Sequence, residues 1–353
     1  MRGSFRIFIS VLSVLLLASC FSWDKNIHKT KVDELSSSPV TALMQERATY
    51  IKERVFSKCT ASGVFISTQG MTLYAGRTGE LAKRVLLLGF TDAFLLFDTN
   101  SDHATLTEFS TGLSNAGINV WLYIDSPRLY AGDKILSGMI KSTVDFCATH
   151  PEIKGILIYQ RPDLITGPAK KYTSNILFSW DDESYGKGLD NDLLMKSALD
   201  IDAKFRKALP PRIEIMQMIS PFYENRIKDG SLSAGSTADF MKICSKLCIA
   251  AYFSDRFQIA ENIELPLKNA SAGASIFVAV RTYVDIYGGA DKEQSLSNKS
   301  WFKLVKDLEN IANTAKPFKS FRGIAFYDYY GLEKMWEKLE AEPAAQNNPE
   351  KAK

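Results

Sequence analysis

Histidine is scarce in this sequence, and the net charge is close to zero. Three of the 353 residues are histidine, and the formal net charge is +3. A metal-dependent barrel hydrolase needs a His-x-His pair on its first strand, and a glycerophosphodiesterase-type barrel needs His-Arg there. The first apolar stretch, 63–68, reads GVFIST and has neither. A nearly neutral chain gives no electrostatic reason to expect nucleic acid. The sequence therefore predicts no metal site, no cofactor and no nucleic-acid partner.

With three histidines in the sequence, few residues could serve as the base of a nucleophilic triad. His28 lies in the polar N-terminal segment and His150 precedes a predicted strand, so a Ser-His-Asp triad would have to use His103. Asp98, Asp102 and His103 could together ligate a metal. Aspartates at the start of a helix, however, commonly accept hydrogen bonds from its free N–H groups. We interpret this segment as a helix start.

The longest apolar run is confined to the N-terminus. It covers residues 7–19, follows Arg2 and Arg6, and is shorter than the about 20 residues that a membrane-spanning helix needs. A positive start followed by a short apolar run is typical of an export signal. The run ends in LASC at Cys20, which resembles a bacterial lipobox. The resemblance implies cleavage before Cys20, lipid on its thiol, and an exported protein anchored to the cell membrane or outer membrane. The alternative is an ordinary secretory signal that contains a cysteine.

Polar segments flank a long central region. Residues 20–38 are polar and end in Ser-Ser-Ser-Pro, which favours a flexible tether after the predicted signal peptide at 1–19. Residues 341–353 are rich in Ala, Pro, Asn and Glu, a composition typical of a disordered tail. The region 40–340 is left as the folded domain, and a domain of this size can bury about three quarters of its unfolded surface.

Four cysteines remain besides Cys20, namely Cys59, Cys147, Cys244 and Cys248. Export makes disulfides possible, and four cysteines allow three connectivities. All four fall at or before the beginnings of predicted strands. We therefore expect structural thiols or one bridge, and no catalytic cysteine.

Eight short apolar stretches alternate with segments of helical periodicity, and the predicted helices are 40–56, 78–89, 106–116, 134–148, 191–209, 237–245, 301–312 and 331–339. The stretches are 63–68, 93–97, 118–124, 153–159, 212–219, 248–253, 275–280 and 321–331. Near-continuous apolar strands are typical of a parallel sheet that is covered on both faces. Eight such units over this length predict a (β/α)8 barrel, a closed parallel sheet of eight strands ringed by helices. The rival is a doubly wound open sheet, whose dinucleotide-binding members carry a glycine-rich turn after the first strand. Gln69-Gly70-Met71 is not such a turn.

Polar residues follow the predicted strands, where a (β/α)8 barrel places its chemistry. These strand exits carry Gln69, Asp98, Asp125, Gln160, Arg161, Asp163, Ser220, Asp255, Arg281 and Asp328. Glycoside hydrolysis usually needs two carboxylic groups, one to donate a proton and one to attack or to activate water. Aromatic rings on or near the strands also suit the apolar faces of sugars; they are Trp121, Tyr123, Tyr159, Trp180, Tyr252, Tyr283, Tyr327 and Tyr329.

The strand–helix rhythm and the stretches GVFIST, GINVWLYID, KGILIY and RGIAFYDYYG resemble TIM-barrel glycoside hydrolases and the hydrolase-like barrels of bacterial lipoproteins. The resemblance covers 59–339 and implies a Glu acid/base at the exit of the fourth strand and a second acid on a later strand. This chain has Gln160 and Arg161 at that exit, with Asp163 as the nearest carboxylate. The chitinase-like run of alternating acids that ends in Glu is also missing.

The first functional hypothesis is a lipid-anchored barrel that acts on an envelope or extracellular glycan. Asp328, with Asp125 or Asp98, would be the acid/base pair. Further candidates for contact with the ligand are Gln160, Arg161, Asp163, Asp255, Arg281, Tyr283, Tyr327 and Trp180. The alternative is a lipoprotein that binds carbohydrate or organises the envelope without cleaving anything. A third hypothesis is a phosphate-ligand enzyme that uses Gly288-Gly289.

The eighth stretch is expected to close the barrel against the first. A period of two puts Ile324, Phe326 and Asp328 on one face and Gly323, Ala325 and Tyr327 on the other. The small residues suit a crowded barrel interior. The pattern thus predicts that Tyr327 points inward and Asp328 toward the helices, unless a twist or bulge at the exit turns Asp328 into the mouth.

Overall fold

The chain divides into two compact units, Met1–Glu46 and Arg47–Lys353. The computed structural model describes residues 42–167, 175–183, 188–271, 273–283 and 292–340. The predicted signal peptide, Cys20 and its tether, Gly288-Gly289 and the tail at 341–353 lie outside the described residues. Within the described ranges, no helix is both long and apolar enough to cross a membrane.

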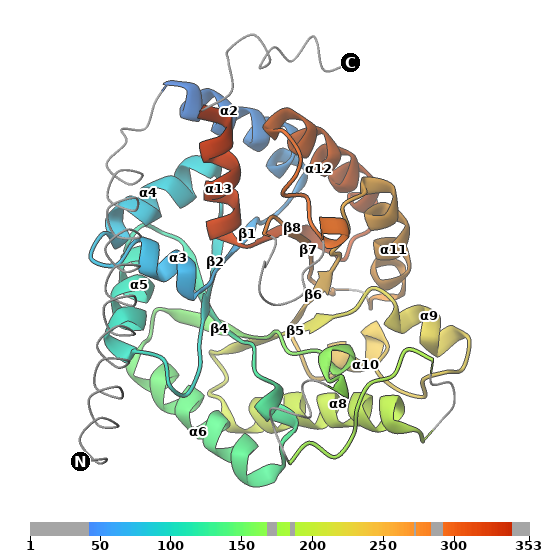
Figure 1. Cartoon of the computed structure of the whole chain (residues 1–353). Helices are drawn as coiled ribbons and strands as arrows, with labels where there is room; N and C mark the ends of the chain where they lie inside the picture. The colour runs from blue at the N-terminus through green and yellow to red at the C-terminus, as the bar shows by residue number, and fades with distance from the viewer. Residues whose placement is uncertain (1–41, 168–174, 184–187, 272, 284–291, 341–353) are drawn as a thin grey trace, which may run out of the picture. The chain divides into compact units, whose positions relative to one another are not determined.

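Eight parallel strands close into a barrel in chain order, and the last pairs with the first (Figure 1). They are β1 Gly63–Ile66, β2 Asp92–Leu96, β3 Asn119–Ile124, β4 Ile153–Ile158, β5 Glu214–Ile219, β6 Lys246–Ala250, β7 Ile276–Arg281 and β8 Phe321–Tyr327. The predicted (β/α)8 barrel is confirmed. The predicted bounds differ most at two strands. β6 covers Lys246–Ala250 and not 248–253, and the eighth stretch, predicted at 321–331, forms a strand only to Tyr327 before α13 begins.

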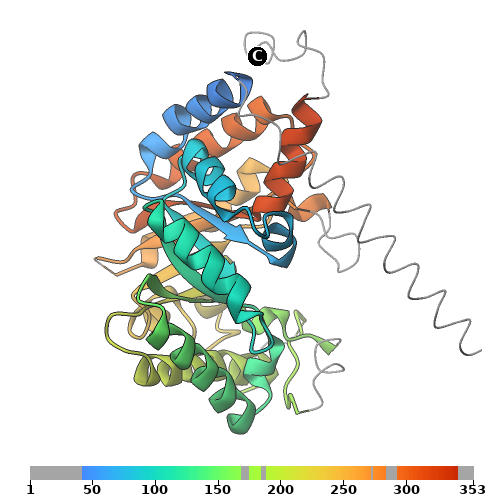
Figure 2. The ribbon, with the colours of Figure 1, turned by 90° about the vertical axis from the view of Figure 1, so that its left-hand side faces the viewer.

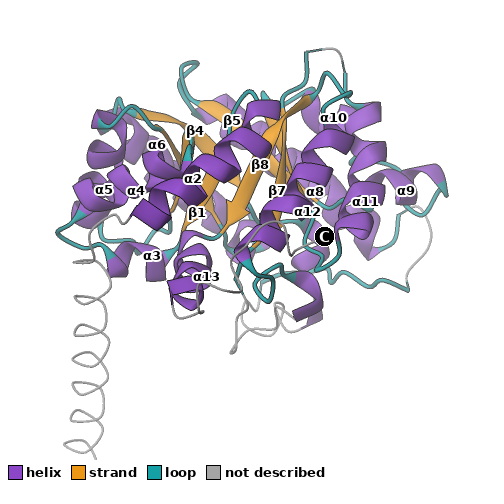
Figure 3. Cartoon of the chain, turned by 90° about the horizontal axis from the view of Figure 1, so that it is seen from above, coloured by secondary structure: helices purple, strands orange, loops and turns teal. Residues whose placement is uncertain are grey.

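Helices surround the strands, as the side view and the view from above show (Figures 2 and 3). They are α2 Ala42–Arg54, α3 Thr68–Leu73, α4 Thr78–Leu88, α5 His103–Asn115, α6 Asp133–Thr149, α8 Asp190–Ala208, α9 Tyr223–Lys228, α10 Thr237–Met241, α11 Arg256–Asn269, α12 Trp301–Ala315 and α13 Tyr329–Glu340. Gly89 ends α4 with a φ of 89°, a conformation that glycine adopts at little cost. Asp102 caps α5 by accepting a hydrogen bond from the Ala104 N–H. The interpretation of this segment as a helix start is confirmed.

Three helices have no counterpart in the prediction: α3, α9 and α11. The exit residue Gln69 lies in α3, because β1 already ends at Ile66. The helix α11 contains Pro266 in its interior, although proline removes a backbone hydrogen bond there and is a local signal against a helix. Asp255 caps the start of α11, and the helix packs against α12. Tertiary packing therefore outweighs the local effect of the proline.

The barrel interior is filled by side chains from alternate positions of the strands. Ala325 and Tyr327 of β8 belong to this interior cluster. Phe326, from the other face of β8, packs against Phe56 and Phe90 on the helix side, with ring centroids 6.2 and 5.4 Å away. The two faces predicted for β8 are thus confirmed.

Glycine at position 323 allows β8 to close on the segment before β1. A Cβ atom at Gly323 would lie 1.8 Å from the carbonyl oxygen of Ala61. The carbonyl oxygen of Arg322 accepts hydrogen bonds from the N–H groups of Thr60 and Ala61, at 2.8 and 3.1 Å. Only a residue without a side chain leaves room for this approach.

The four described cysteines are free thiols. Burial raises the pKa of Cys59 to about 11 and that of Cys147 to about 12, so neither is a reactive thiolate near neutral pH. Cys244 donates a hydrogen bond to Asp202 at 3.3 Å. Cys248 lies within β6 and faces the barrel interior. Of the two expectations, the structural thiols are confirmed and the bridge is not formed.

Candidate functional site

Aromatic side chains close the barrel interior at the C-terminal ends of the strands. We call Phe65, Tyr123, Tyr159, Tyr252 and Tyr327 the aromatic floor. Tyr327 lies at its centre, with ring centroids 5.1 Å from Tyr159, 5.3 Å from Phe65, 5.9 Å from Tyr252 and 6.4 Å from Tyr123. The five residues come from β1, β3, β8 and the segments just after β4 and β6. Each occupies an inward position of its strand, which is why they meet.

Asp125 stands at the exit of β3 beside this floor. Its side chain is exposed to solvent, yet desolvation by the surrounding protein raises its pKa to about 6, against the opposing effect of Arg161 and Arg281. The neighbouring protein thus disfavours the ionised form of Asp125, although its side chain is open to solvent. Near neutral pH this group can hold or release a proton, which is a property of functional acids.

Two arginines face Asp125 over the floor. The guanidinium carbon of Arg161 lies 5.9 Å from the centre of the Tyr252 ring, and that of Arg281 lies 4.2 Å from it. Arg281 also lies 5.7 Å from the centre of the Tyr327 ring. Both arginines lower the pKa of Asp125, but neither forms an ion pair with it in the described part of the chain. The three charged groups therefore border a shared space.

Asp163 holds Arg161 in a fixed orientation. Its carboxylate accepts hydrogen bonds from Nε and Nη2 of Arg161, each at 3.0 Å. The hydroxyl of Tyr223 donates to the same carboxylate. Burial lowers the pKa of Arg161, but Asp163 outweighs burial and keeps the guanidinium charged. A two-pronged contact of this kind fixes the plane of the guanidinium group as well as its position.

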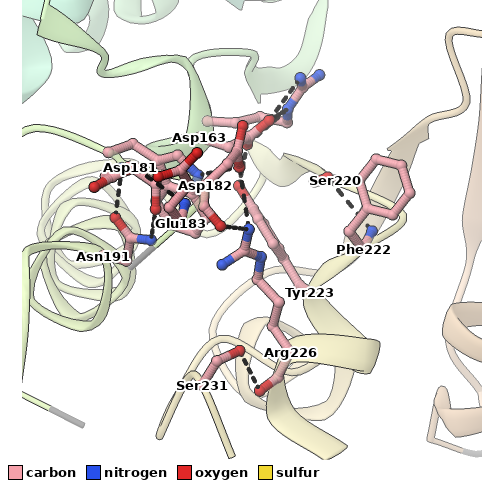
Figure 4. Close-up of polar contacts among 12 residues, drawn as sticks. Asp163, Asp181, Asp182, Glu183, Asn191, Ser220, Phe222, Tyr223, Arg226 and Ser231 are labelled. Carbon is pink, nitrogen blue, oxygen red and sulfur yellow. Dashed lines mark hydrogen bonds and ion pairs between the residues drawn. The ribbon is translucent and has the colours of Figure 1, made fainter. Parts of the chain in front are cut away.

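Polar contacts from the segment 175–183 and from α9 support the pair of Arg161 and Asp163 (Figure 4). Arg226 donates to Asp182 at 3.1 Å, and the indole N–H of Trp180 donates to the same carboxylate at 3.0 Å. The Trp180 ring is buried and lies 6.2 Å from the Tyr223 ring. The structure thus places Trp180 behind Tyr223 as a support, not on the floor.

Asp328 is occupied by structural hydrogen bonds. The Tyr327–Asp328 peptide bond is cis. Asp328 is 3% exposed, and its carboxylate accepts from the hydroxyl of Ser67 and, at 2.9 Å, from the N–H of Gly331. Burial raises its pKa, and these two hydrogen bonds and Arg281 oppose the rise. Asp328 therefore caps α13 and ties it to Ser67, the residue that follows β1.

Asp98 and Asp255 are also engaged locally. Asp98 accepts from the N–H of Asn100 at 3.0 Å and from the hydroxyl of Thr99 at 3.1 Å. Asp255 caps α11 and lines a groove of about 520 Å³ at the starts of α11 and α12, together with Arg256, Phe257, Lys299, Ser300, Phe302, Lys303, Lys306 and Asp307. None of these groove residues belongs to the aromatic floor. Of the predicted carboxylates, Asp125 alone is open to the mouth and free of such contacts among the described residues.

The remaining predicted residues divide between the mouth and its margins. Gln160 is buried next to Arg161, and Tyr283 is half-buried with its ring 6.0 Å from that of Tyr330. The structure brings Asp125, Arg161, Arg281 and Tyr327 together. Among the described residues, no group of three or more His, Cys, Asp or Glu could hold a metal ion.

Two residues of the site have no counterpart in the sequence prediction. Ser67 follows β1 directly and binds Asp328, and Tyr223 binds Asp163 from α9. The signal for Ser67 was its position, one residue beyond an apolar strand. Tyr223 gave no signal, because α9 was not predicted and its contact partner lies 60 residues away.

Comparison with known proteins relates the chain to glycoside hydrolases by fold only. No protein-family model and no curated protein matches it. The crystal structure of the Bacillus cereus spore cortex-lytic enzyme SleL matches with a TM-score of 0.50 at 7% identity, over 79% of this chain and 74% of that chain. A GH18 chitinase from Cycas revoluta in complex with (GlcNAc)3 matches with a TM-score of 0.51 at 9% identity, over 79% of this chain and 99% of that chain. These matches show that the chain shares the barrel fold of such hydrolases.

Proposed function

We propose that this protein is an exported, lipid-anchored protein that binds a glycan of the cell envelope in the mouth of its barrel. Tyr327, the half-buried member of the aromatic floor, offers an apolar ring, and Asp125, Arg161 and Arg281 offer charged hydrogen-bonding groups around it. A concave site that combines rings with a few convergent polar groups is the usual form of a small-ligand site. The fold, shared with enzymes that act on glycans, supports the same choice.

One observation favours binding over standard glycoside hydrolysis. Hydrolysis by two carboxylic groups needs both of them to face the same bond. Asp328, Asp98, Asp163 and Asp255 each hold a cap, a turn or an ion pair, which leaves Asp125 as the open acid. One open acid among these five carboxylates, all in the described part of the chain, supports recognition of a ligand and does not supply the usual pair.

A second candidate function, cleavage with Asp125 as the only protein acid, rests on the raised pKa of that residue. With a pKa of about 6, Asp125 keeps part of its protons near neutral pH, as a general acid must. A single acid suffices where the substrate itself supplies the nucleophile, as in substrate-assisted glycosidases. This route would require an N-acetylated sugar next to the bond that breaks.

The Asp125→Asn variant separates the two candidates. We expect the wild-type protein and the variant both to retain envelope glycan fragments in a pull-down, because the change removes the charge of Asp125 and keeps its shape. Mass spectrometry should detect no cleavage products from either protein. Products from the wild type that fall at least about 100-fold in the variant would favour cleavage. Asp98→Asn is the matched control, since Asp98 only holds its own turn. Failure of the wild type to retain any glycan would contradict both candidates.

The lipid anchor is tested separately at Cys20. We expect Cys20→Ala to move the protein from the membrane pellet to the soluble fraction, because the lipid is the proposed attachment. The control is Cys59→Ala, which also removes a thiol but leaves the lipobox intact. This variant should stay with the membrane. Mass spectrometry of the N-terminal peptide measures the lipid directly. A Cys20→Ala protein that remains in the pellet would contradict the anchor.

A further inference from the structure

We propose that the ligand of the barrel mouth is an acidic glycan, whose sugar carboxylate is received by Arg161 and Arg281 while its ring lies on Tyr327, the half-buried ring of the aromatic floor. This inference rests on the proposed glycan-binding function and names the class of ligand.

The two arginines are built into the site and not carried on its surface. Arg161 is 8% exposed, is clamped by Asp163, and lies over Tyr252. Arg281 ends β7 and lies over both Tyr252 and Tyr327, with Nη1 donating to Gln294 at 3.2 Å. A guanidinium that lies over a ring keeps its N–H edge free for a partner in its own plane. The floor therefore presents two guanidinium edges to one space.

Each of the two arginines has one buried donor group that no described residue engages. The clamp uses Nε and Nη2 of Arg161, and its buried Nη1 has no hydrogen-bond partner among the described residues. The buried Nε of Arg281 likewise has no hydrogen-bond partner among the described residues. A buried charged donor without a partner is costly, and a carboxylate is the acceptor that satisfies it best. A neutral sugar offers only uncharged oxygen atoms to these donors.

The charge balance of the mouth makes anion binding dependent on Asp125. The charged and titratable groups that act on Asp125 are Tyr123, Tyr159, Arg161, Arg281 and Tyr327. Asp163 already offsets Arg161, and Arg281 acts both on Asp125 and on the buried Asp328, whose pKa burial raises. Protonation of Asp125 therefore makes the mouth more positive by one charge. An incoming carboxylate should therefore bind with uptake of a proton by Asp125. Affinity for an acidic sugar should rise as pH falls toward the pKa of Asp125, whereas affinity for a neutral sugar should not change.

Isothermal titration calorimetry with matched acidic and neutral probes tests this assignment. One arm compares an oligogalacturonate with its methyl ester, and the other compares N-acetylmuramic acid with N-acetylglucosamine. In each pair the carboxylate is present in one member and absent or masked in the other. We expect the acidic member to bind at least about tenfold more tightly in one or both arms. The arm that responds tells whether a ring carboxylate or a lactyl carboxylate is the source.

Variants show whether Arg281 carries the preference. Arg281→Gln should remove the acidic preference, so that the affinity for the acidic member falls by more than the affinity for the neutral member. Arg281→Lys, which keeps the charge and loses the planar fork, should keep part of the preference. Lys303→Gln removes a positive charge on α12, outside the floor, and should keep the full preference for the acidic member. Asp125→Asn should raise the affinity for the acidic member at about pH 7.5 and abolish the roughly tenfold gain expected between that pH and about pH 5.5.

Each result decides between the claims. Equal binding of acidic and neutral members overturns the acidic-glycan assignment and leaves glycan binding standing. A sugar phosphate that binds where both carboxylates fail overturns it as well. Equal weakening of both members by Arg281→Gln would give Arg281 a structural role and would also overturn it. Failure of every probe to bind would overturn the proposed function together with this inference.

Discussion

Replacement of Asp92 by alanine should lower the free energy of unfolding by about 3–5 kcal/mol, because it breaks a buried network that includes charged groups. Asp92 is 0% exposed at the start of β2. It accepts from the indole N–H of Trp121 at 2.9 Å and from the hydroxyl of Thr91 at 2.7 Å, and it lies 3.8 Å from Arg322. Without the carboxylate, the buried indole N–H loses its acceptor and Arg322 loses its counter-charge. Urea unfolding followed by circular dichroism measures the loss.

The control for Asp92 is an aspartate of the same chemistry on the surface. The side chain of Asp200 is 59% exposed and forms an ion pair with Lys204 at 2.7 Å. Asp200→Ala should cost less than about 1 kcal/mol, as exposed ion pairs do. Similar losses for the two variants would show that the Asp92 network contributes nothing beyond a surface pair. Folded Asp92→Ala protein should keep its glycan affinity, since β2 begins at the end of the barrel opposite the mouth.

Replacement of Tyr327 by alanine should weaken glycan binding at least about tenfold and destabilise the fold by about 3 kcal/mol. The Tyr327 ring contacts four other rings of the aromatic floor and lies beside Arg281. Its removal opens a cavity at the centre of the floor and takes away part of the surface on which the proposed sugar lies. Calorimetry with the glycan that the wild type retains, and urea unfolding, measure the two effects.

Tyr327→Phe separates the ring from its hydroxyl. This variant keeps the ring contacts, so it should retain most of the affinity and lose no more than about 1.5 kcal/mol of stability. If Tyr327→Ala folds and binds glycan as the wild type does, the floor is not the ligand surface. If Tyr327→Phe loses binding as completely as Tyr327→Ala, the hydroxyl and not the ring is the contact.

The barrel could be predicted because its signals are local and repeated. Each strand is a short apolar stretch, and Gly89 and Asp102 mark helix ends through backbone conformation and hydrogen bonding that involve only near neighbours. The two faces of β8 follow from the alternation of side chains along a strand. The helix α11 was not predicted. Pro266 is a local signal against a helix, and packing of α11 against α12 outweighs it.

The candidate site was predicted only in part, because the contacts that define it are long-range. In sequence, Asp125 and Asp328 are the same kind of residue, an aspartate after an apolar strand. Their difference arises from partners far along the chain: Ser67 engages Asp328, whereas protein around Asp125 desolvates it and leaves it open. The clamp on Arg161 likewise needs Tyr223 from α9 to fix Asp163.

The sequence by itself determined the fold class, the order of the strands and the inward direction of Tyr327, since periodicity and chain order are properties of neighbouring residues. The tertiary structure decided which polar side chains are free to meet a ligand. Asp98, Asp255 and Asp328 hold turns and helix starts, while Asp125 faces Arg161 and Arg281 over the aromatic floor. The reason is physical: burial, hydrogen bonding and charge at one position depend on groups that only the closed barrel brings together.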